Sequence, residues 1–590
     1  MNNLNKYDWN LLPLLQNKTI EQWKKEIIEH YEIIFSLKGK ITNNIDNLKE
    51  FLDHSKKSSI IVSKIGCYLH NLENVDLSNT EISKLVNDFD LFLYPWGIKL
   101  SFVSNELKDN VEKILNMLDE ETAIYKKSFE RLKRRKKHKI SNREEKLLSV
   151  LSNALGNSDE IFSKLTNVDF SFGEVEDSQG VKYKLTQGTA SKLLRDKDIV
   201  LRKNSYFAFW KEYKKHENTL SATYYANLCE TSAFSKIYKY KSSLEAALFS
   251  DNVTPKFYNF ALNQIAKNSK LLLKWRKILV NKTGISNPKP WDWNTEIFSP
   301  IDKKYEINDS QRIIKDALSI LGSDYVAKLD KAFENNWIDW LPKDSKRSGA
   351  YSYGVWEGNP YILLNWNGKY LDLSTLAHEL GHSMHTLYSN ENQDYEYHDY
   401  PIFLAEVAST TNELLLVEYL LKHEENPQMR AYILENAIRE IIGTIYRQAL
   451  FADFEQIVHN KVDQNEPITL DVFKNICKEL YPKYFPKLKT ETYEDEFENL
   501  WGLYVPHFYS DFYVYKYATA MISAISFTNK ILNGNKGDVE NYLSFLKMGS
   551  SEWPIDALKK SGVDLLDKKT YDEAFELLEH YLCELEKLLN

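Results

Sequence analysis

The sequence has few of the residues that break helices or cross-link chains. Its 590 residues include 15 prolines, 20 glycines and 4 cysteines. The scarcity of proline and glycine favours a globular, mostly helical protein. The cysteines lie far apart and form no Cys-x-x-Cys pair, which argues against a disulfide framework and a thiolate metal site and fits a reducing compartment. They are Cys67, Cys229, Cys477 and Cys583.

The sequence also lacks long apolar runs and an excess of positive charge. No stretch reaches the roughly 18 apolar residues that a membrane-spanning helix needs, and residues 1–13 contain no continuous apolar core of the kind found in secretory signals. The net charge is −8, which disfavours nucleic acid as the main partner. The basic run at residues 131–139 can contact nucleic acid, but on an acidic protein such a run is more often a solvated helix end. We therefore expect a cytoplasmic protein with neither a membrane nor a nucleic-acid partner.

Hydrophobic periodicity divides the chain into a helical first part and a mixed second part. Apolar residues recur at helical spacing from about residue 19 to residue 155, and residues 168–187 have the alternation and turn residues of a β-hairpin. Asn287, Pro288, Pro290, Ser299 and Pro300 mark a loop or a junction between lobes. We place a helical N-terminal lobe at residues 1–200 and a second domain at residues 201–590, with an approximate boundary.

The pattern His378-Glu379-Leu380-Gly381-His382 is typical of a zinc site. Residues four apart lie on one face of a helix, so both imidazoles can bind a single metal ion. Glu379 then points its carboxylate at the open position of the metal and acts as the general base. The alternative is a core helix whose two histidines form structural hydrogen bonds.

The residues around this pattern predict a helix, because apolar side chains recur at spacings of three and four from Leu373 to Leu387. Asp372 or Ser374 is available as the N-cap. Gly381 costs such a helix about 1 kcal/mol relative to alanine, which indicates that another backbone approaches it closely.

Two short strands are predicted just before this helix, at residues 349–355 and 361–366, around a turn that contains Gly358 and Pro360. An extended peptide can add itself to an exposed strand edge through main-chain hydrogen bonds. The alternative is a hairpin that only supports the helix.

A catalytic zinc ion needs a third protein ligand. The longer pattern H-E-x-x-H-x-x-G-x-x-H is absent, because His385 and Tyr388 occupy its glycine and histidine positions. His385 shares the face of the two histidines and either meets the substrate or caps a neighbour. Residues 390–400 contain several acidic side chains, but the stretch has the composition of an exposed loop, which would hold ligands poorly.

Glu406 is the better third ligand. It lies in a helical pattern between Leu404-Ala405 and Val407-Ala408, and a carboxylate among apolar neighbours needs a partner. A bound cation supplies one, and a salt bridge is the alternative. Glu413, two turns further along the same face, can orient a zinc-bound histidine.

Several segments of the sequence together resemble oligoendopeptidase F, a family grouped with thimet oligopeptidase among the zinc peptidases. The similarity extends over most of the chain beyond about residue 130. The segments are Gly349-Ala-Tyr-Ser, Tyr361-Ile-Leu-Leu-Asn, Thr375-Leu-Ala-His-Glu-Leu-Gly-His-Ser-Met-His385, Phe403-Leu-Ala-Glu-Val-Ala-Ser-Thr-Thr-Asn-Glu413, Asp198-x-x-x-Arg202, Pro506-His-Phe-Tyr-Ser-Asp-Phe-Tyr-Val-Tyr-Lys-Tyr-Ala518 and Tyr542-Leu-Ser-Phe-Leu-Lys547.

The resemblance implies a mostly α, large two-lobed helical fold with a deep substrate channel and a small β-sheet next to the zinc-binding helix. It also implies cleavage of short peptides but not of folded proteins. The family's zinc ligands fall on His378, His382 and Glu406, and its base falls on Glu379, in agreement with the spacing argument.

The resemblance further implies that tyrosines and a histidine near the C-terminus face the scissile bond. Tyrosine hydroxyls and imidazole N–H groups are suitable donors to the oxyanion of a tetrahedral intermediate. The alternative is that these rings only pack in an aromatic core. The matching positions are His507, Tyr509, Tyr513, Tyr515 and Tyr517, of which His507, Tyr513 and Tyr515 are our catalytic candidates.

The sequence thus predicts a cytoplasmic metalloendopeptidase that holds one zinc ion per chain and hydrolyses internal bonds of short, unstructured peptides. One alternative is an exopeptidase of the same chemistry that releases C-terminal dipeptides. Another is a non-catalytic helical protein that binds peptides, although the intact Glu379 weighs against it.

Overall fold

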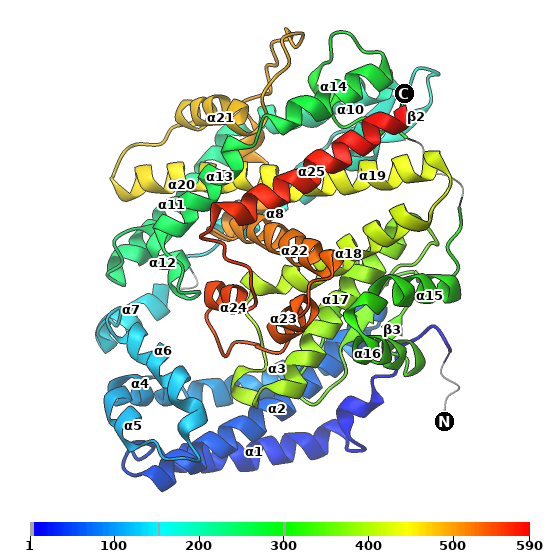
Figure 1. The fold of residues 1–590 in the computed structure, drawn as a ribbon. Coiled ribbons are helices and arrows are strands. Elements are labelled where there is room, and N and C mark those ends of the chain that lie inside the picture. The colour runs from blue at the N-terminus through cyan, green and yellow to red at the C-terminus, as the bar shows by residue number, and fades with distance from the viewer. Residues whose placement is uncertain (1–4, 152–153, 299–302, 590) are drawn as a thin grey trace. The chain divides into compact units, whose positions relative to one another are not determined.

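The computed structural model describes residues 5–151, 154–298 and 303–589 (Figure 1). Helices make up most of the structure, and the strands form two small sheets. The predicted mostly α fold is therefore confirmed. None of the helices within these ranges is long and apolar enough to cross a membrane.

The chain forms two compact units, and each unit contains three separate stretches of sequence. The first unit comprises Met1–Lys139, Asp302–Tyr419 and Phe527–Val563, and the second comprises Ile140–Ile301, Leu420–Ser526 and Asp564–Asn590. We predicted two domains that are each continuous in sequence and meet near residue 200. The two units group residues by their proximity in space, so they do not test this boundary, and it stays a prediction.

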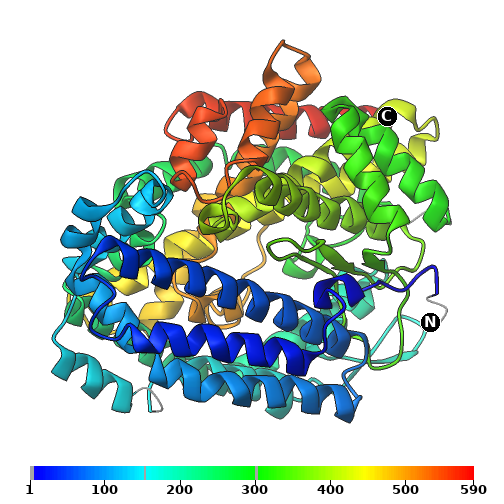
Figure 2. The same ribbon diagram turned by 90° about the horizontal axis from the view of Figure 1, so that it is seen from below.

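The first unit begins with a group of helices that pack along their lengths, as Figure 2 shows for α1 to α3. A capping box starts α1, in which the hydroxyl of Thr19 accepts the N–H of Gln22 and the Gln22 side chain accepts the N–H of Thr19. Trp23, Ile27 and Ile65 are among the buried residues that join the three helices. The elements are η1 Leu12–Leu15, α1 Ile20–Ser36, α2 Ile45–Val75, α3 Thr80–Lys99, α4 Phe102–Asp109, α5 Val111–Met117, η2 Ala123–Tyr125 and α6 Lys126–Lys136.

The remaining elements of the first unit include a three-stranded sheet, against which α17 packs. Helix α18 extends four residues beyond Tyr419 into the second unit. The elements are α15 Ile307–Leu318, η5 Ser319–Leu321, α16 Ser323–Glu334, β3 Ile338–Asp339, β4 Tyr351–Tyr353, β5 Tyr361–Leu363, α17 Tyr370–Asn392, η6 Tyr395–Tyr397, α18 Ile402–His423, α23 Asp538–Leu546 and α24 Pro554–Lys560.

This sheet has the strand order β3-β5-β4. The central strand β5 is fully buried, as its continuous apolar run requires, and it pairs parallel to β3 and antiparallel to β4. The two strands predicted around the turn are thus confirmed as β4 and β5. Strand β3 is an addition that the sequence did not predict, and β4 is left at the edge of the sheet.

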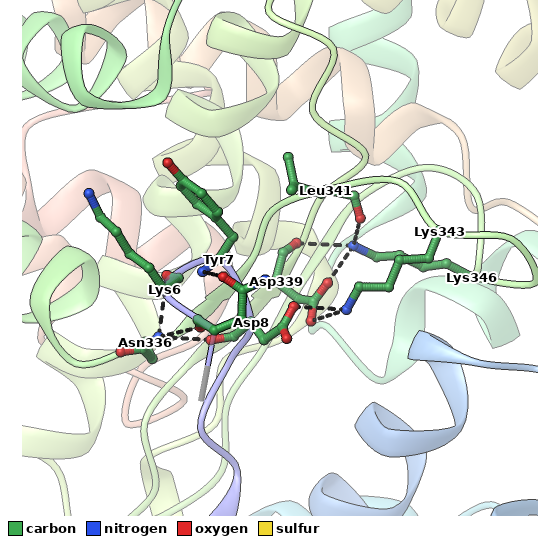
Figure 3. A network of polar contacts seen from close by, with 9 residues as sticks. Lys6, Tyr7, Asp8, Asn336, Asp339, Leu341, Lys343 and Lys346 are labelled. Atoms are coloured by element: carbon green, nitrogen blue, oxygen red, sulfur yellow. Dashed lines mark hydrogen bonds and ion pairs between the residues drawn. The ribbon is translucent and has the colours of Figure 1, made fainter. Parts of the chain in front are cut away.

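The N-terminal segment runs beside β3 and is attached by hydrogen bonds to residues on either side of this strand (Figure 3). The N–H of Trp340 donates to the carbonyl of Tyr7 over 3.0 Å. The side-chain amide of Asn336 donates to the carbonyls of Lys6 and Asp8 over 3.3 and 2.9 Å. The first residues of the described chain therefore belong to the same unit as the sheet.

A buried ion pair holds the loop that follows β3 (Figure 3). The ammonium group of Lys346 lies 2.6 Å from a carboxylate oxygen of Asp339, and both side chains are at most 1% exposed. Lys346 also donates to the carbonyl of Leu341 over 2.7 Å. Burial lowers the pKa of Lys346, and the Asp339 carboxylate opposes this shift. The loop between β3 and β4 is thus fixed by charges that water does not reach.

The second unit is almost entirely helical. The predicted hairpin is confirmed, because β1 and β2 pair antiparallel around a turn, whereas the predicted junction residues Ser299 and Pro300 lie outside the described ranges. The elements are α7 Asn142–Leu151, α8 Ser158–Lys164, η3 Leu165–Asp169, β1 Glu174–Glu176, β2 Lys182–Lys184, α9 Gln187–Arg195, α10 Ile199–Lys215, α11 Glu217–Ile237, α12 Ser243–Phe249, α13 Pro255–Lys267, α14 Leu271–Thr283, η4 Pro290–Asp292, α19 Pro427–Ile441, η7 Ile442–Arg447, α20 Gln448–Asp463, α21 Leu470–Tyr484, η8 Trp501–Leu503, η9 Pro506–Tyr509, α22 Tyr515–Asn533, whose last turns belong to the first unit, and α25 Lys568–Leu589.

Candidate active site

The histidine pattern lies on helix α17, as predicted. The helix begins at Tyr370, and the Asp372 carboxylate accepts the N–H groups of Asn367 and Lys369, both over 2.9 Å. The prediction that Asp372 or Ser374 is the N-cap residue is therefore wrong. Lys369 occupies that position, and Asp372 stabilises the helix start from within the first turn.

Three potential ligand atoms converge between α17 and α18. The Nε2 atoms of His378 and His382 are 3.1 Å apart, and Oε2 of Glu406 lies 3.4 and 3.7 Å from them. These three residues form a group that can hold a metal ion. Bonds of about 2.1 Å in tetrahedral geometry separate ligand atoms by roughly 3.4 Å. The observed spacing and the two-nitrogen, one-oxygen donor set therefore fit a catalytic zinc ion.

Hydrogen bonds behind the histidines fix their ring orientation. Nδ1 of His378 lies 2.5 Å from Oε1 of Glu413, and the Ser374 hydroxyl donates to the other Glu413 oxygen over 3.0 Å. His382 hydrogen-bonds the backbone of Ala405, the neighbour of Glu406 in sequence. Since Nδ1 of His378 is engaged by Glu413, the Nε2 lone pair of this ring is directed at the shared position. Glu413 thus takes the orienting place expected for it.

Helices α17 and α18 can pack this closely because of Gly381. A Cβ atom at this residue would lie 2.5 Å from Cα of Ser409 and 2.7 Å from the carbonyl oxygen of Ala408. The predicted close approach of another backbone is confirmed. The buried amide of Asn412 adds a bond across the same contact by donating to the carbonyl of Ala377 over 3.2 Å. This contact brings Glu406 to the histidines.

Glu379 is placed as a proton acceptor. Its side chain is only 6% exposed, and the backbone N–H of Ser352 in edge strand β4 donates to it. Burial raises the pKa of Glu379 to about 7, the shift being partly opposed by the charge of His378. Within the described part of the chain, Oε2 of Glu379 has no hydrogen-bond partner. A carboxyl group with this pKa can take up and release a proton near neutral pH.

Ser352 is a contributor that the sequence analysis did not identify. Besides its backbone bond to Glu379, its hydroxyl lies 2.8 Å from that of Ser383 on α17. The sequence predicts the strand, but a backbone N–H is common to almost all residue types, so this role of Ser352 could not be predicted from the sequence.

His382 and Glu406 have protonation states suited to metal binding, whereas His378 has to release a proton, because burial lowers its pKa but Glu413 and Glu406 outweigh that effect and raise it well above the ordinary value. Burial lowers the pKa of His382 to about 4, and the charge of His378 adds to this shift. Burial alone would raise the pKa of Glu406, but hydrogen bonding to His378 and the charge of the histidines hold it at about 2. Near pH 7 the site therefore offers a neutral imidazole and a carboxylate, as a metal requires.

His385 does not take either of the roles expected for it. Its ring is fully buried and stacks on Tyr400, with ring centroids 3.6 Å apart and planes 5° apart. Its other aromatic neighbour is Phe545, at 5.2 Å. The expectation that residues 390–400 form an exposed loop is met only in part, because residues 390–392 end helix α17, residues 395–397 form η6 and Tyr397 is buried. Among the described residues, no carboxylate of this stretch joins the metal-binding group.

The C-terminal candidates lie in the second unit and separate into two sets. The hydroxyls of Tyr513 and Tyr517 are 2.9 Å apart. The ring of His507 is almost parallel to that of Tyr513, with centroids 6.2 Å apart. Tyr515 points into the core, where it is 2% exposed and its ring contacts that of Tyr258 at 4.9 Å. Because packing accounts for Tyr515, its predicted catalytic role is not carried further.

Comparison with protein families gives one match over most of the chain. Residues 192–577 match the description "Peptidase family M3", and residues 107–172 match "Oligopeptidase F". The chain belongs to peptidase family M3. It is therefore a metal-dependent peptidase, and the predicted resemblance to oligoendopeptidase F is confirmed.

Individual relatives cover the whole chain. It is 34% identical to an oligopeptidase PepF of Bacillus subtilis, over 96% of this chain and 85% of that protein. It is 33% identical to an oligoendopeptidase F homolog of Borreliella burgdorferi, over 100% of this chain and 99% of that protein. A solved structure from Chlamydophila abortus superposes with a TM-score of 0.90 at 30% identity and 99% coverage of both chains. The oligoendopeptidase-F of Enterococcus faecium, at 24% identity and a TM-score of 0.74 over 96% of this chain and 98% of that one, shares the fold.

Proposed function

We propose that this M3 peptidase is a zinc-dependent endopeptidase that cleaves short, unstructured peptides. The observation that carries the proposal is the tetrahedral spacing of His378, His382 and Glu406 beside the buried carboxyl of Glu379. Two imidazoles and one carboxylate form a frequent ligand set of catalytic zinc. The names of the relatives support peptides as substrates.

The residues of this chain have distinct tasks in hydrolysis. When bound, zinc supplies a Lewis acid for the peptide carbonyl and increases the acidity of a water molecule. Glu379 accepts a proton from the attacking water and later donates it to the leaving amine, which its pKa of about 7 permits in both directions. Glu413 keeps the ring of His378 in the binding orientation.

The oxyanion that forms during attack needs a hydrogen-bond donor. We propose Tyr513 and His507 for this role, because a phenol and an imidazole are suitable donors. The His507 side chain is exposed and that of Tyr513 is half-buried, whereas Tyr515 is buried in the core. Tyr513→Phe and His507→Ala should lower kcat more than they raise KM.

The experiment that tests the site compares three variants by metal analysis and peptide hydrolysis. His378→Ala and His382→Ala should each lose zinc after dialysis against a mild chelator. Glu379→Gln should keep one zinc ion per chain and lose activity by about 10²- to 10⁴-fold. Stoichiometric zinc in both histidine variants, or a Glu379→Gln variant within tenfold of the wild type, would refute the assignment.

The endopeptidase proposal is tested by substrate form. The enzyme should cut peptides of about 6 to 20 residues internally and leave folded proteins intact, as expected if substrates bind in a confined channel. An unstructured polypeptide of about a hundred residues, compared at equal molarity with its own short fragments, should be cut much more slowly. Equal rates would indicate an open cleft. Loss of cleavage on blocking the peptide C-terminus would instead favour release of C-terminal dipeptides.

The proposed cytoplasmic location rests on the cysteines, since all four are free in the structure. Cell fractionation with an antibody against the native protein should place it with cytoplasmic markers.

A further inference from the structure

The turn that leads into α22 has an unusual backbone conformation. Phe512 adopts a φ of 55°, in the left-handed region that bulky side chains avoid. A residue persists in this region only where its surroundings hold it there, and such strain is concentrated at functional sites. The contacts that hold Phe512 are therefore informative.

The first of these contacts is a carboxyl group buried in the middle of α20. The N–H of Phe512 donates to Oε1 of Glu455 over 2.9 Å, and the Glu455 side chain is fully buried. Burial raises the pKa of Glu455 well above its ordinary value, and the charge of Asp511 adds to this effect. In the described structure its second oxygen has no hydrogen-bond partner. A leucine would fill this position at a lower desolvation cost. The reason to have a carboxyl group here is therefore the oxygen that accepts the N–H of Phe512.

The preceding residue, Asp511, is held from two helices. Its carboxylate accepts hydrogen bonds from the side-chain amide of Asn227, over 3.0 Å, and from the hydroxyl of Thr231, both on α11. On α20, Nε2 of His459 lies 3.3 Å from the same carboxylate. The His459 ring also lies on that of Phe512, with centroids 4.5 Å apart. Both residues at the bend are thus fixed to the helical core of the second unit.

The turn carries the proposed oxyanion donors. The N–H of Tyr513 donates to the carbonyl of Ser510 over 3.2 Å, and the N–H of Ser510 donates to that of His507 over 3.0 Å. A rotation at Phe512 would therefore move Tyr513 relative to His507 and separate its hydroxyl from that of Tyr517.

We propose that Glu455 and Asp511 are positioning residues that hold the bend at Phe512 and thereby set the orientation of Tyr513 and His507. This inference rests on the proposed function, because it needs one of these two side chains to act on the substrate. Glu455 supplies the acceptor for the strained amide, and Asp511 supplies the anchor to α11. Neither group exchanges a proton with the substrate.

The test replaces the acceptor in two ways. Glu455→Gln retains an oxygen that can accept the Phe512 N–H, so its kcat should stay within about twofold of the wild type. Glu455→Leu removes the acceptor, and its kcat should fall about 10- to 100-fold while KM and zinc content change less than threefold. This difference between kcat and KM, with rescue by the conservative variant, separates positioning from general destabilisation.

Glu435 provides a matched control. Its side chain, 2% exposed, accepts the N–H groups of Ile297 and Phe298, both over 2.9 Å, and also pairs with Arg439 over 2.9 Å, in the same unit but away from the turn. Glu435→Leu should lower the melting temperature as Glu455→Leu does, yet retain kcat. An equal fall in kcat for both leucine variants would mean that stability alone is responsible and would overturn the proposal.

Thr231→Val probes the same turn with a smaller change, because it removes only the hydroxyl that donates to Asp511. It should lower kcat about three- to tenfold at unchanged KM. This variant decides the question if Glu455→Leu does not fold. A wild-type kcat in the folded Thr231→Val variant would then overturn the role of Asp511.

A double-variant cycle separates this inference from the proposed function. If Glu455 acts through Tyr513, the combination of Glu455→Leu and Tyr513→Phe should lower kcat little more than the stronger single change does. If the fall in kcat of the double variant equals the product of the two single falls, positioning is rejected and the donor role is left intact. The same conclusion follows if Glu455→Leu has the kcat of the wild type while Tyr513→Phe has a lower kcat. Wild-type kcat in both Tyr513→Phe and His507→Ala would reject the donor role and positioning together, while the Glu379→Gln variant still reports on the metal site.

Discussion

Gly381→Ala is the most informative single change at the metal site, because it adds one methyl group where two helices meet. The new Cβ would lie 2.5 Å from Cα of Ser409, so the backbones must separate by about 0.9 Å to reach an ordinary contact distance of 3.4 Å. Glu406 is one turn away from Ser409 on the same helix. Metal sites tolerate deviations of only about 0.2 Å in their bonds, so this shift would remove Glu406 from the ligand set.

Two opposing effects determine the stability of this variant. Alanine is favoured over glycine in a helix by about 1 kcal/mol, while overpacking costs about 1 to 3 kcal/mol. Because the three atoms nearest the new methyl group are backbone atoms and cannot move aside alone, we expect the cost to exceed the gain. The metal-free protein should lose roughly 1 to 2 kcal/mol, and its affinity for zinc should fall at least tenfold.

The measurement combines unfolding in the presence of a chelator with competition for zinc against a metal-binding dye. Gly66→Ala on α2 is the matched control, since a Cβ atom at this residue would have no neighbour within 4 Å. It should gain up to about 1 kcal/mol and keep its zinc affinity. A Gly381→Ala variant that is as stable as the wild type and binds zinc equally well would refute the packing argument.

Three further outcomes follow from single groups. The pKa of Glu379 is raised from its ordinary value of 4.5 to about 7 in the folded protein. The protonated Glu379 side chain therefore stabilises the folded state below pH 4.5, and this contribution is lost as the pH rises through 7. Metal-free Glu379→Gln should therefore unfold like the wild type at pH 4 and be up to about 3 kcal/mol more stable at pH 8, measured by urea denaturation. Glu413→Ala should weaken zinc binding about 10- to 100-fold in chelator competition, because it frees the ring of His378. Lys346→Met should cost less unfolding free energy than the about 3 to 5 kcal/mol of a buried charge left without a partner, because Asp339 loses Lys346 but keeps its ion pair with the partly exposed Lys343, and Asp339→Asn in the same chain should recover part of the loss.

The elements that the sequence predicted well are those decided by local pattern. The helix that carries the histidine pattern follows from apolar spacing around His378, and the close contact at Gly381 follows from the cost of glycine in a helix. Glu406 was chosen because a carboxylate among apolar side chains needs a partner, and it lies beside the two histidines. In each case the reason lies within a few residues of the position itself.

The features that were missed depend on contacts between distant stretches. Strand β3 has only two residues and exists through parallel pairing with β5. The backbone donor of Ser352 has no signature in the side chain. Tyr513 and Tyr515 differ only in their place relative to the start of α22, so their sequence pattern could not show that one is accessible and the other is packed. His385 was misjudged because its stacking partner, Tyr400, lies in a stretch with the composition of a loop.

Each of the two units is formed by three separate stretches of sequence, and this arrangement has a consequence for folding during protein synthesis. Residues 527–563 complete the first unit, and residues 564–590 complete the second. A ribosome that has synthesised the first 500 residues has therefore produced neither unit in full, although the three residues of the candidate metal-binding group are already in the nascent chain. Domains that are continuous in sequence can fold one after another during translation. Here both units must wait for the last tenth of the chain, so exposed apolar helix faces persist until then and need protection from aggregation.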